Sequence, residues 1–322
     1  MRFATWEAGG VVTAGVVSDD GLHALPEGTT VLDLVRAGLP AAREAGAEAL
    51  RGPAVPLDCV RLLPPLQAPT VRDFVAFEEH VEGVRKAIDG VAGVVDEWYQ
   101  APTFYFTNPY ALVGAHDDVP VPPGSQRFDF ELEVAVVVGR DGASLTPEQA
   151  REHVFGYTVL NDWSARDLQA REMRVNLGPA KGKDSATTLG PWLVTADELE
   201  PSRDDEGFLQ LAMQVGVNGV EVGRDLLSNM GWPFEELISY ASRGTEVRAG
   251  DVLGSGTCGN GGCLAELWGI RGEAAPPPLR PGDVVEMTVE GIGTVRNRVV
   301  AGVELPPVRP ARPRPRTRTR TA

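Results

Sequence analysis

The chain has 322 residues, of which 43% are hydrophobic, and its formal net charge is −15. This size supports one large domain and a smaller one, and the acidity argues against a general nucleic-acid binder. No apolar run approaches the roughly 18 residues of a membrane span, and the charged N-terminus argues against a signal peptide. The three cysteines form no CxxC pair, which favours a reducing compartment and argues against a structural zinc site. We therefore expect a cytoplasmic protein without nucleic-acid or membrane partners.

Residues 1–66 predict a small N-terminal α+β domain. Apolar runs at 3–6 and 11–17 flank two glycines, as in a β-hairpin. A short helix is expected over 31–43, and the proline-rich segment 62–66 connects this domain to the rest of the chain.

Residues 67–305 predict a mixed, mainly β body with short helices. Strand-like apolar runs make up this body, at 132–138, 154–160, 209–217 and 284–289. The 37 glycines and 26 prolines indicate many turns, which fits a β body better than a doubly wound α/β fold. The tail, residues 306–322, is rich in proline and arginine, and we expect it to be disordered.

The segment 71–80 places a carboxylate, Asp73, seven residues before a histidine, His80. If this segment is helical, the two side chains lie on one face. A lone histidine is more often structural or exposed. His80 is nevertheless the best placed of the four histidines, because a neutral imidazole beside a candidate metal ligand is a natural base for taking a proton from water.

In the segment 128–136, acidic residues alternate strictly with apolar ones as far as residue 134. A strand would place Asp129, Glu131 and Glu133 on one face. An amphipathic strand with a wet side would explain this pattern. However, neighbouring carboxylates repel each other unless a cation lies between them, and oxygen ligands suit a hard ion such as Mg²⁺, Ca²⁺ or Mn²⁺.

The segment NDWSARDLQ, residues 161–169, follows a run that predicts a buried strand, and we expect a helix to start at its acidic residue. Three polar side chains and one methionine would then share one helical face: Asp162, Arg166, Gln169 and Met173. A lysine, Lys183, follows shortly downstream. A solvated helix face explains such spacing in most proteins. The alternative is a carboxylate that holds a metal next to cationic groups that hold an anionic substrate.

The last informative segment, residues 253–267, is rich in glycine. Its backbone can approach a ligand closely, with N–H groups and the Thr257 hydroxyl as donors. It is not a phosphate-binding loop, because no Gly-Lys-Ser/Thr follows.

In this order, the four segments resemble the fumarylacetoacetate hydrolase (FAH) superfamily over roughly residues 66–305. The NDWSARDLQ and SGT…EL blocks are the most specific. The resemblance implies a β-sandwich-like roll, a homodimer, and one divalent cation, Mg²⁺ or Mn²⁺ with Ca²⁺ as the alternative. The implied metal ligands are Asp73, Glu131, Glu133 and Asp162. The implied catalytic residues are His80, Glu266, which orients it, and Lys183. The implied substrate contacts are Arg166, Gln169, Tyr105, Gly256 and Thr257.

Two positions depart from the mammalian-type members of this family. Substrate-contacting tyrosines of those enzymes fall on Val75 and Met173 here. Both changes remove a hydroxyl and leave apolar surface, which suggests a less polar or differently shaped acyl portion than that of fumarylacetoacetate.

The resemblance implies a hydrolase that cleaves a carbon–carbon bond in a 1,3-diketo acid, an acylpyruvate or a fumarylacetoacetate-like compound. A water activated by His80 would attack, and the metal would stabilise the departing enolate. One alternative is decarboxylation or keto–enol isomerisation of a 2-oxo acid on the same metal platform. Others are a natural-product pathway enzyme and a non-enzymatic binder of a small acid. In each case the partner is a small anionic diketo or 2-oxo acid.

Overall fold

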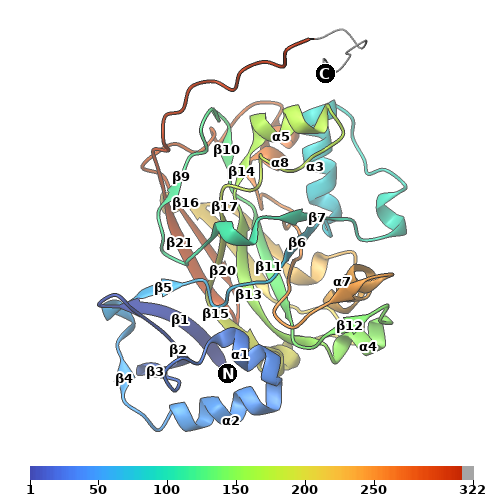
Figure 1. Ribbon diagram of the computed structural model, residues 1–322. Helices are drawn as coiled ribbons and strands as arrows, with labels where there is room; N and C mark the ends of the chain where they lie inside the picture. Colours follow the sequence, from blue (N-terminus) through green and yellow to red (C-terminus); the bar gives the residue numbers. More distant parts are fainter. Residues whose placement is uncertain (314–322) are drawn as a thin grey trace, which may run out of the picture.

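The computed structural model describes residues 1–313, apart from the side chains of residues 88 and 89. Its strands form one twelve-stranded sheet, one five-stranded sheet and two two-stranded sheets, with short helices around them (Figure 1). This confirms the predicted mixed, mainly β architecture.

The twelve-stranded sheet carries most of the predicted site residues. Its hydrogen-bonded path runs β4-β3-β2-β1-β15-β13-β11-β19-β6-β7, with β5 beside β1 and β8 beside β15. In that order the strands of the path span Ala54–Val55, Gly21–Ala24, Val11–Ser18, Arg2–Ala8, Thr187–Thr195, Val154–Asp162, Leu132–Val138, Val252–Gly254, Val71–Phe74 and Phe104–Thr107. The two added strands are β5 (Arg61–Leu63) and β8 (Leu112–Val113).

Strand β11 lies between β13 and β19 and is buried along its whole length. Val134 and Val136 join the main hydrophobic core, whereas Ala135 and Val137, which point to the other face, join a second core with Val31 of the N-terminal region. Burial on both faces explains why this strand reads as a continuous apolar run.

The five-stranded sheet packs against the large one, as in a sandwich. Its order is β17-β16-β20-β21-β9, and the strands span Val220–Leu226, Ala212–Val217, Val284–Val289, Gly293–Val300 and Val119–Pro120. Val215 of β16 and Met287 of β20 share the main core with Val134 of β11. Buried and exposed residues alternate along β20, as expected for a strand with one face in a core. The small sheets pair β10 (Phe128–Asp129) with β14 (Ser164–Ala165), and β12 (Gly142–Ala143) with β18 (Glu246–Val247).

The α-helices of residues 1–313 have at most 12 residues. They are α1 (Val31–Ala37), α2 (Leu39–Ala49), α3 (Glu78–Asp89), α4 (Pro147–Arg151), α5 (Arg166–Met173), α6 (Ala196–Leu199), α7 (Phe234–Ser242) and α8 (Leu264–Arg271). None within this range is long and apolar enough to cross a membrane.

The N-terminal hairpin is confirmed by the pairing of β1 with β2. The single helix predicted over 31–43 is wrong, because Gly38 adopts a φ of +90° and divides the segment into α1 and α2. Strand β1 also pairs with β15, so the N-terminal strands continue the large sheet. The domain boundary near residue 66 stays a prediction.

Three other sequence-based expectations need correction. Asp73 lies on strand β6, and α3, which holds His80, begins only at Glu78. Asp162 is the last residue of β13, where it pairs with Thr187, and α5 begins four residues later. The strand predicted from residue 209 begins at residue 212, since Leu209 instead forms an isolated bridge with Arg203.

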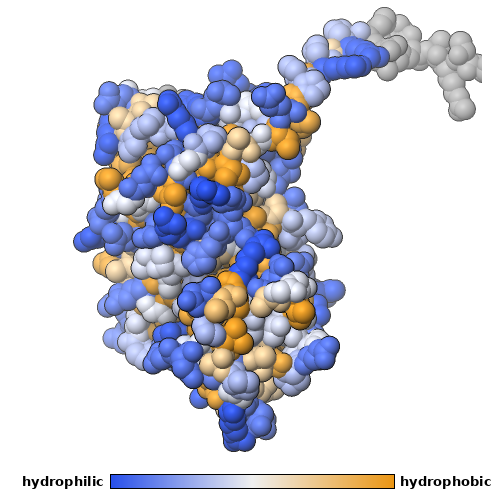
Figure 2. Space-filling model, turned by 90° about the vertical axis from the view of Figure 1, so that its left-hand side faces the viewer, coloured by the Kyte–Doolittle hydropathy of each residue, from blue (hydrophilic) through white to orange (hydrophobic). Residues whose placement is uncertain are grey.

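The described part of the tail, residues 306–313, has no helix or strand and is exposed. It extends away from the body (Figure 2). On the face that Figure 2 shows, hydrophilic and hydrophobic residues are interspersed. The rest of the segment that we predicted to be disordered, 314–322, lies outside the described residues.

Candidate active site

Ten of the fourteen predicted site residues line one cavity of about 320 Å³. They are Asp73, Val75, His80, Tyr105, Glu131, Arg166, Gln169, Met173, Lys183 and Thr257. The other four, Glu133, Asp162, Gly256 and Glu266, are buried beside them. A larger cavity of about 1060 Å³ beside α1 contains none of the predicted site residues.

The four predicted metal ligands meet although they are far apart in the sequence. Asp73, Glu133 and Asp162 lie on the strands β6, β11 and β13, and Glu131 lies in the short segment between β10 and β11. One oxygen of each lies within 4.8 Å of the oxygens of the other three, and all four residues are buried. The sheet order explains this, because β19 lies between β11 and β6.

A glycine on β19 makes the approach possible. Gly254 pairs with Ala135 on one side and with Asp73 on the other. A Cβ atom at this position would lie 2.4 Å from Oδ1 of Asp73 and 2.8 Å from Oε2 of Glu133. Only glycine therefore leaves room for the two carboxylates.

Two cations face the carboxylates. Nζ of Lys183 donates to Oε2 of Glu131 at 2.5 Å and to Oδ2 of Asp162 at 2.6 Å. Arg166 forms ion pairs with Glu131 at 2.7 Å and with Asp129 at 2.8 Å. The Tyr105 hydroxyl also donates to Asp162, at 2.5 Å.

The four carboxylates differ in the direction in which their surroundings shift the pKa. Burial opposes the ionisation of Glu131, but Lys183 and Arg166 together hold its pKa well below its usual range. Burial, and then the nearby Asp162, raise the pKa of Asp73 well above its usual range. The pKa of Glu133 is raised in the same way, by burial and then by Asp73. At Asp73, burial and the neighbouring carboxylate thus outweigh the opposing effect of Lys183 on the pKa.

The residues fit a divalent cation. Two buried oxygens, Oδ1 of Asp73 and Oδ1 of Asp162, have no hydrogen-bond partner among the described residues. Oxygen-only ligand sets suit hard ions such as Mg²⁺ and Mn²⁺. A cation between these oxygens would remove the repulsion that burial intensifies.

His80 lies at the edge of the same cavity, where helix α3 crosses α8. A Cβ atom at Gly83 would lie 2.4 Å from Cγ of Glu266, and one at Gly269 would lie 2.0 Å from the carbonyl oxygen of Gly83. This close crossing brings Nδ1 of His80 to 3.8 Å from Oε2 of Glu266. Nδ1 also lies 3.7 Å from Sγ of Cys263.

Gly256 and Thr257 hold Glu133, one of the predicted metal ligands, in place. The Gly256 N–H donates to Oε2 of Glu133 at 3.1 Å, and the Thr257 hydroxyl donates to Oε1 at 3.5 Å. Gly256 has a φ of +80°, which favours glycine. Thr257, unlike Gly256, also lines the cavity.

The remaining lining is largely apolar. Val75 and Met173 both face the cavity, as do Phe74, Val84 and Phe104. Met173 is 46% exposed and belongs to the C-terminal end of α5. The pocket therefore combines an ionic part with an apolar part.

Sequence reasoning missed the roles of two residues. Asp129 accepts hydrogen bonds from the backbone N–H groups of Leu264 and Ala265 as well as from Arg166, and so ties α5 to the N-terminus of α8. The alternation over 128–136 pointed to this residue. Cys263 contacts His80, but its position in a glycine-rich turn carried no such signal.

Comparison with known proteins agrees with the geometry. A family model described as the C-terminal part of fumarylacetoacetate (FAA) hydrolase matches residues 70–300. The chain is 34% identical to oxaloacetate tautomerase YisK of Bacillus subtilis, over 58% of this chain and 56% of that protein. It is 32% identical to fumarylacetoacetase of Arabidopsis thaliana, over 65% and 60% of the two chains. It thus spans little more than half the length of these relatives.

A solved structure covers nearly the whole chain. The fumarylacetoacetate hydrolase of the psychrophilic Exiguobacterium antarcticum has a TM-score of 0.69 and 27% identity, over 94% of this chain and 99% of that one. The similar proteins therefore share the fold but carry the names of both hydrolases and a tautomerase.

Proposed function

The chain belongs to the fumarylacetoacetate hydrolase family, and we propose that it is a metal-dependent hydrolase that cleaves a carbon–carbon bond of a 1,3-diketo acid. The observation that carries this proposal is the meeting of His80, Glu266 and the four carboxylates around one cavity. A metal-dependent hydrolase needs this combination, whereas a passive binder of small acids has no use for a histidine that faces a buried glutamate.

One divalent cation, Mg²⁺ or Mn²⁺ with Ca²⁺ as the alternative, would be held by Asp73, Glu131, Glu133 and Asp162 and would supply Lewis acidity toward the substrate oxygens. Lys183 bridges two of these carboxylates. Its ammonium therefore fixes their orientation and carries a positive charge to the edge of the cavity.

In the proposed reaction, His80 takes a proton from a water molecule. The oxygen of this water bonds to the acyl carbonyl carbon, and the bond between that carbon and the central carbon then breaks. Because Nδ1 faces Glu266 and Cys263, Nε2 is the nitrogen available to the water. The protonated His80 returns the proton to the central carbon, which releases two acids. General base catalysis of this kind contributes roughly 10²- to 10⁴-fold.

Cationic and amide groups would bind the substrate's carboxylate. Arg166 donates to the Gln169 side chain at 3.2 Å, and both line the cavity on one face of α5. Lys183 can also donate to the oxyanion that develops at the attacked carbonyl. One such donor is worth on the order of 3 kcal/mol.

The second candidate function is the keto–enol isomerisation of a 2-oxo acid. It is favoured by the 34% identity to a protein named oxaloacetate tautomerase. Tautomerisation needs a base and a Lewis acid but no attacking water. The same residues would catalyse tautomerisation, with His80 moving a proton between carbon and oxygen. Decarboxylation at the same site is a related alternative.

We also propose a homodimer and a cytoplasmic location. Strand β7 is at the end of the large sheet, and it exposes 62% of Phe106, followed by Tyr110 at 94%. Exposed aromatic residues at an unpaired strand edge favour association. Light scattering of the purified protein measures its mass in solution and so tests the homodimer.

The test of function is a substrate panel. The protein, loaded with Mg²⁺ or Mn²⁺, is assayed with acylpyruvates, fumarylacetoacetate and oxaloacetate, with EDTA and His80→Ala controls. Release of two acids from a diketo acid, lost with EDTA and with His80→Ala, supports the hydrolase. Enol–keto conversion of oxaloacetate without cleavage of any diketo acid would instead assign the tautomerase, and carbon dioxide release the decarboxylase.

A further inference from the structure

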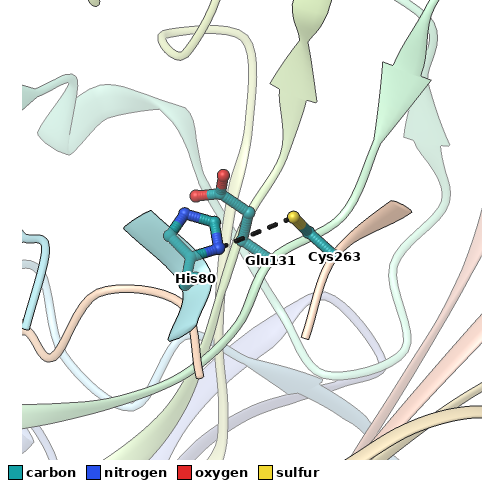
Figure 3. Close-up of side chains that lie close together, drawn as sticks. All are labelled: His80, Glu131 and Cys263. Atoms are coloured by element: carbon teal, nitrogen blue, oxygen red, sulfur yellow. Dashed lines mark hydrogen bonds between the residues drawn. The ribbon is translucent and has the colours of Figure 1, made fainter. Parts of the chain in front are cut away.

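Beside the four carboxylates lies a second group of metal-ligating side chains. His80, Glu131 and Cys263 each offer one ligand atom within 4.8 Å of the other two, and all three residues are buried. Figure 3 shows these side chains, which come from separate segments, gathered around the imidazole of His80. We propose that they form a second metal site, the His–Cys–Glu site, which takes Zn²⁺ or another thiophilic divalent cation.

The spacing of the first two ligands matches a tetrahedral ion. Nδ1 of His80 lies 3.7 Å from Sγ of Cys263 (Figure 3). Zinc binds nitrogen at about 2.0 Å and sulfur at about 2.3 Å, so tetrahedral ligands of these types lie roughly 3.5 Å apart. The two side chains are therefore already arranged for coordination. A water molecule or substrate oxygen would fill the fourth position.

The chemistry of the donors separates this site from its neighbour. The carboxylate site offers only oxygens, which hard ions prefer. The His–Cys–Glu site offers an imidazole nitrogen, a thiol sulfur and a carboxylate oxygen, which zinc prefers. Glu131 belongs to both groups. The two sites would thus take different ions while sharing one carboxylate.

An independent observation points to a cation at the same place. Oε2 of Glu266 is buried without a hydrogen-bond partner among the described residues, and it lies 3.8 Å from Nδ1 of His80. Its other oxygen accepts from the Gly261 N–H at 3.0 Å. A cation on Nδ1 would give this orphaned carboxylate oxygen a positive neighbour, and buried charges in proteins are usually paired or coordinate metals.

Occupancy of this site would switch the enzyme off. Binding displaces the proton of the Cys263 thiol to solvent. With Nδ1 of His80 on the ion, the proton of the neutral imidazole lies on Nε2, so this nitrogen no longer accepts a proton from water. This consequence rests on the proposed function, whereas the metal site itself does not.

The test uses cobalt, whose bond to a thiolate gives a charge-transfer absorption in the near ultraviolet. The full-length protein is freed of metal with EDTA and given saturating Mg²⁺ to fill the carboxylate site, and Co²⁺ is then titrated without substrate. We expect the band to appear and to saturate at one Co²⁺ per chain. Zn²⁺ should displace the bound Co²⁺, and the band should then disappear.

Variants identify the ligands. Cys263→Ser should abolish the band, and His80→Ala should weaken Co²⁺ binding at least tenfold. Cys258→Ser is the matched control, because Cys258 is equally buried but does not belong to the group, and it should keep the band. Circular dichroism checks that each variant is folded.

The proposal is overturned if the wild-type protein gives no thiolate–cobalt band, or if the band persists in Cys263→Ser. Loss of the band in folded Cys258→Ser would also overturn it, since the sulfur ligand would then be a different one. Because no substrate is present, these outcomes do not depend on whether the protein is a hydrolase.

Discussion

Oδ1 of Asp73 lies 2.4 Å from the point that a Cβ atom of residue 254 would occupy. The absence of a side chain at Gly254 is therefore a condition for the carboxylate cluster. We expect Gly254→Ala to displace the carboxylates and to lower Mn²⁺ affinity at least tenfold, measured by titration calorimetry. Overpacking should also cost about 1–3 kcal/mol of stability. Gly52→Ala, in the loop after α2, is the control and should leave the affinity unchanged.

His80→Ala should lower kcat by roughly 10²- to 10⁴-fold, because it removes the proposed base. The carboxylates remain, so Mn²⁺ affinity should stay within about twofold of that of the wild type. Glu266→Gln keeps the side-chain volume, and it should reduce kcat by less than His80→Ala does. Steady-state kinetics with the best acylpyruvate checks both variants. Unchanged turnover in His80→Ala would show that another group activates water.

The stability of the metal-free protein should fall as pH rises. Burial raises the pKa of Asp73, Glu133 and Asp162 above their usual values, so the folded protein holds these protons more tightly than the unfolded chain. The resulting stabilisation is present below about pH 4, the unfolded pKa range, and is lost as pH rises through the higher folded values. Glu131, whose pKa is lowered, contributes to stability with the opposite dependence on pH, and its contribution changes only at lower pH.

We therefore expect the melting temperature in EDTA to decrease from about pH 5.5 to about pH 8. Mn²⁺ should raise the melting temperature more at the higher pH, because binding requires deprotonated carboxylates. Scanning fluorimetry measures both trends, with Glu133→Gln as the control that should flatten the slope. A melting temperature that rises with pH in EDTA would contradict this account.

The apolar part of the cavity should select the acyl group. Val75→Tyr and Met173→Tyr each add a hydroxyl to the lining, and we expect kcat/KM for fumarylacetoacetate to rise relative to an alkyl acylpyruvate. A single new contact of this kind is worth about 1–3 kcal/mol, or roughly 10- to 200-fold. Competition assays with both substrates measure the ratio. An unchanged ratio in both variants would remove these positions from the specificity argument.

Asp129 should matter for stability more than for chemistry. Its carboxylate is fully buried and accepts from three backbone N–H groups and from Arg166. Asp129→Ala would leave the guanidinium without one of its two carboxylates and should destabilise the fold by roughly 3–5 kcal/mol. Urea denaturation measures the change, and Asp118→Ala, which removes an exposed pair with Arg298, should cost less than about 1 kcal/mol.

The sequence predicted the central strands well, because β11 and β13 are buried on both faces and read as long apolar runs. It also predicted which side chains gather at the cavity, although it misplaced two of them locally. Asp73 and Asp162 were expected on helices, yet both lie on strands. Spacings of four and seven residues suggested helices, whereas strand pairing with residues far along the chain decided the outcome.

The contact between His80 and Cys263 could not be predicted from the sequence. It depends on the close crossing of α3 and α8 at Gly83 and Gly269, and no local pattern encodes that crossing. The break at Gly38 could likewise not be predicted, since an isolated glycine within a helical pattern can either be tolerated or end the helix.

The parallel pairing of β6 with β19 joins Asp73 to Gly254, and so closes a loop that holds most of the body. During synthesis, β6 leaves the ribosome long before its partner strand exists. The carboxylate cluster can therefore assemble only late, after the glycine-rich segment has emerged, and contacts this distant in sequence form slowly. A chain truncated before β19 would possess every proposed ligand of the hard ion and still have no place to hold it.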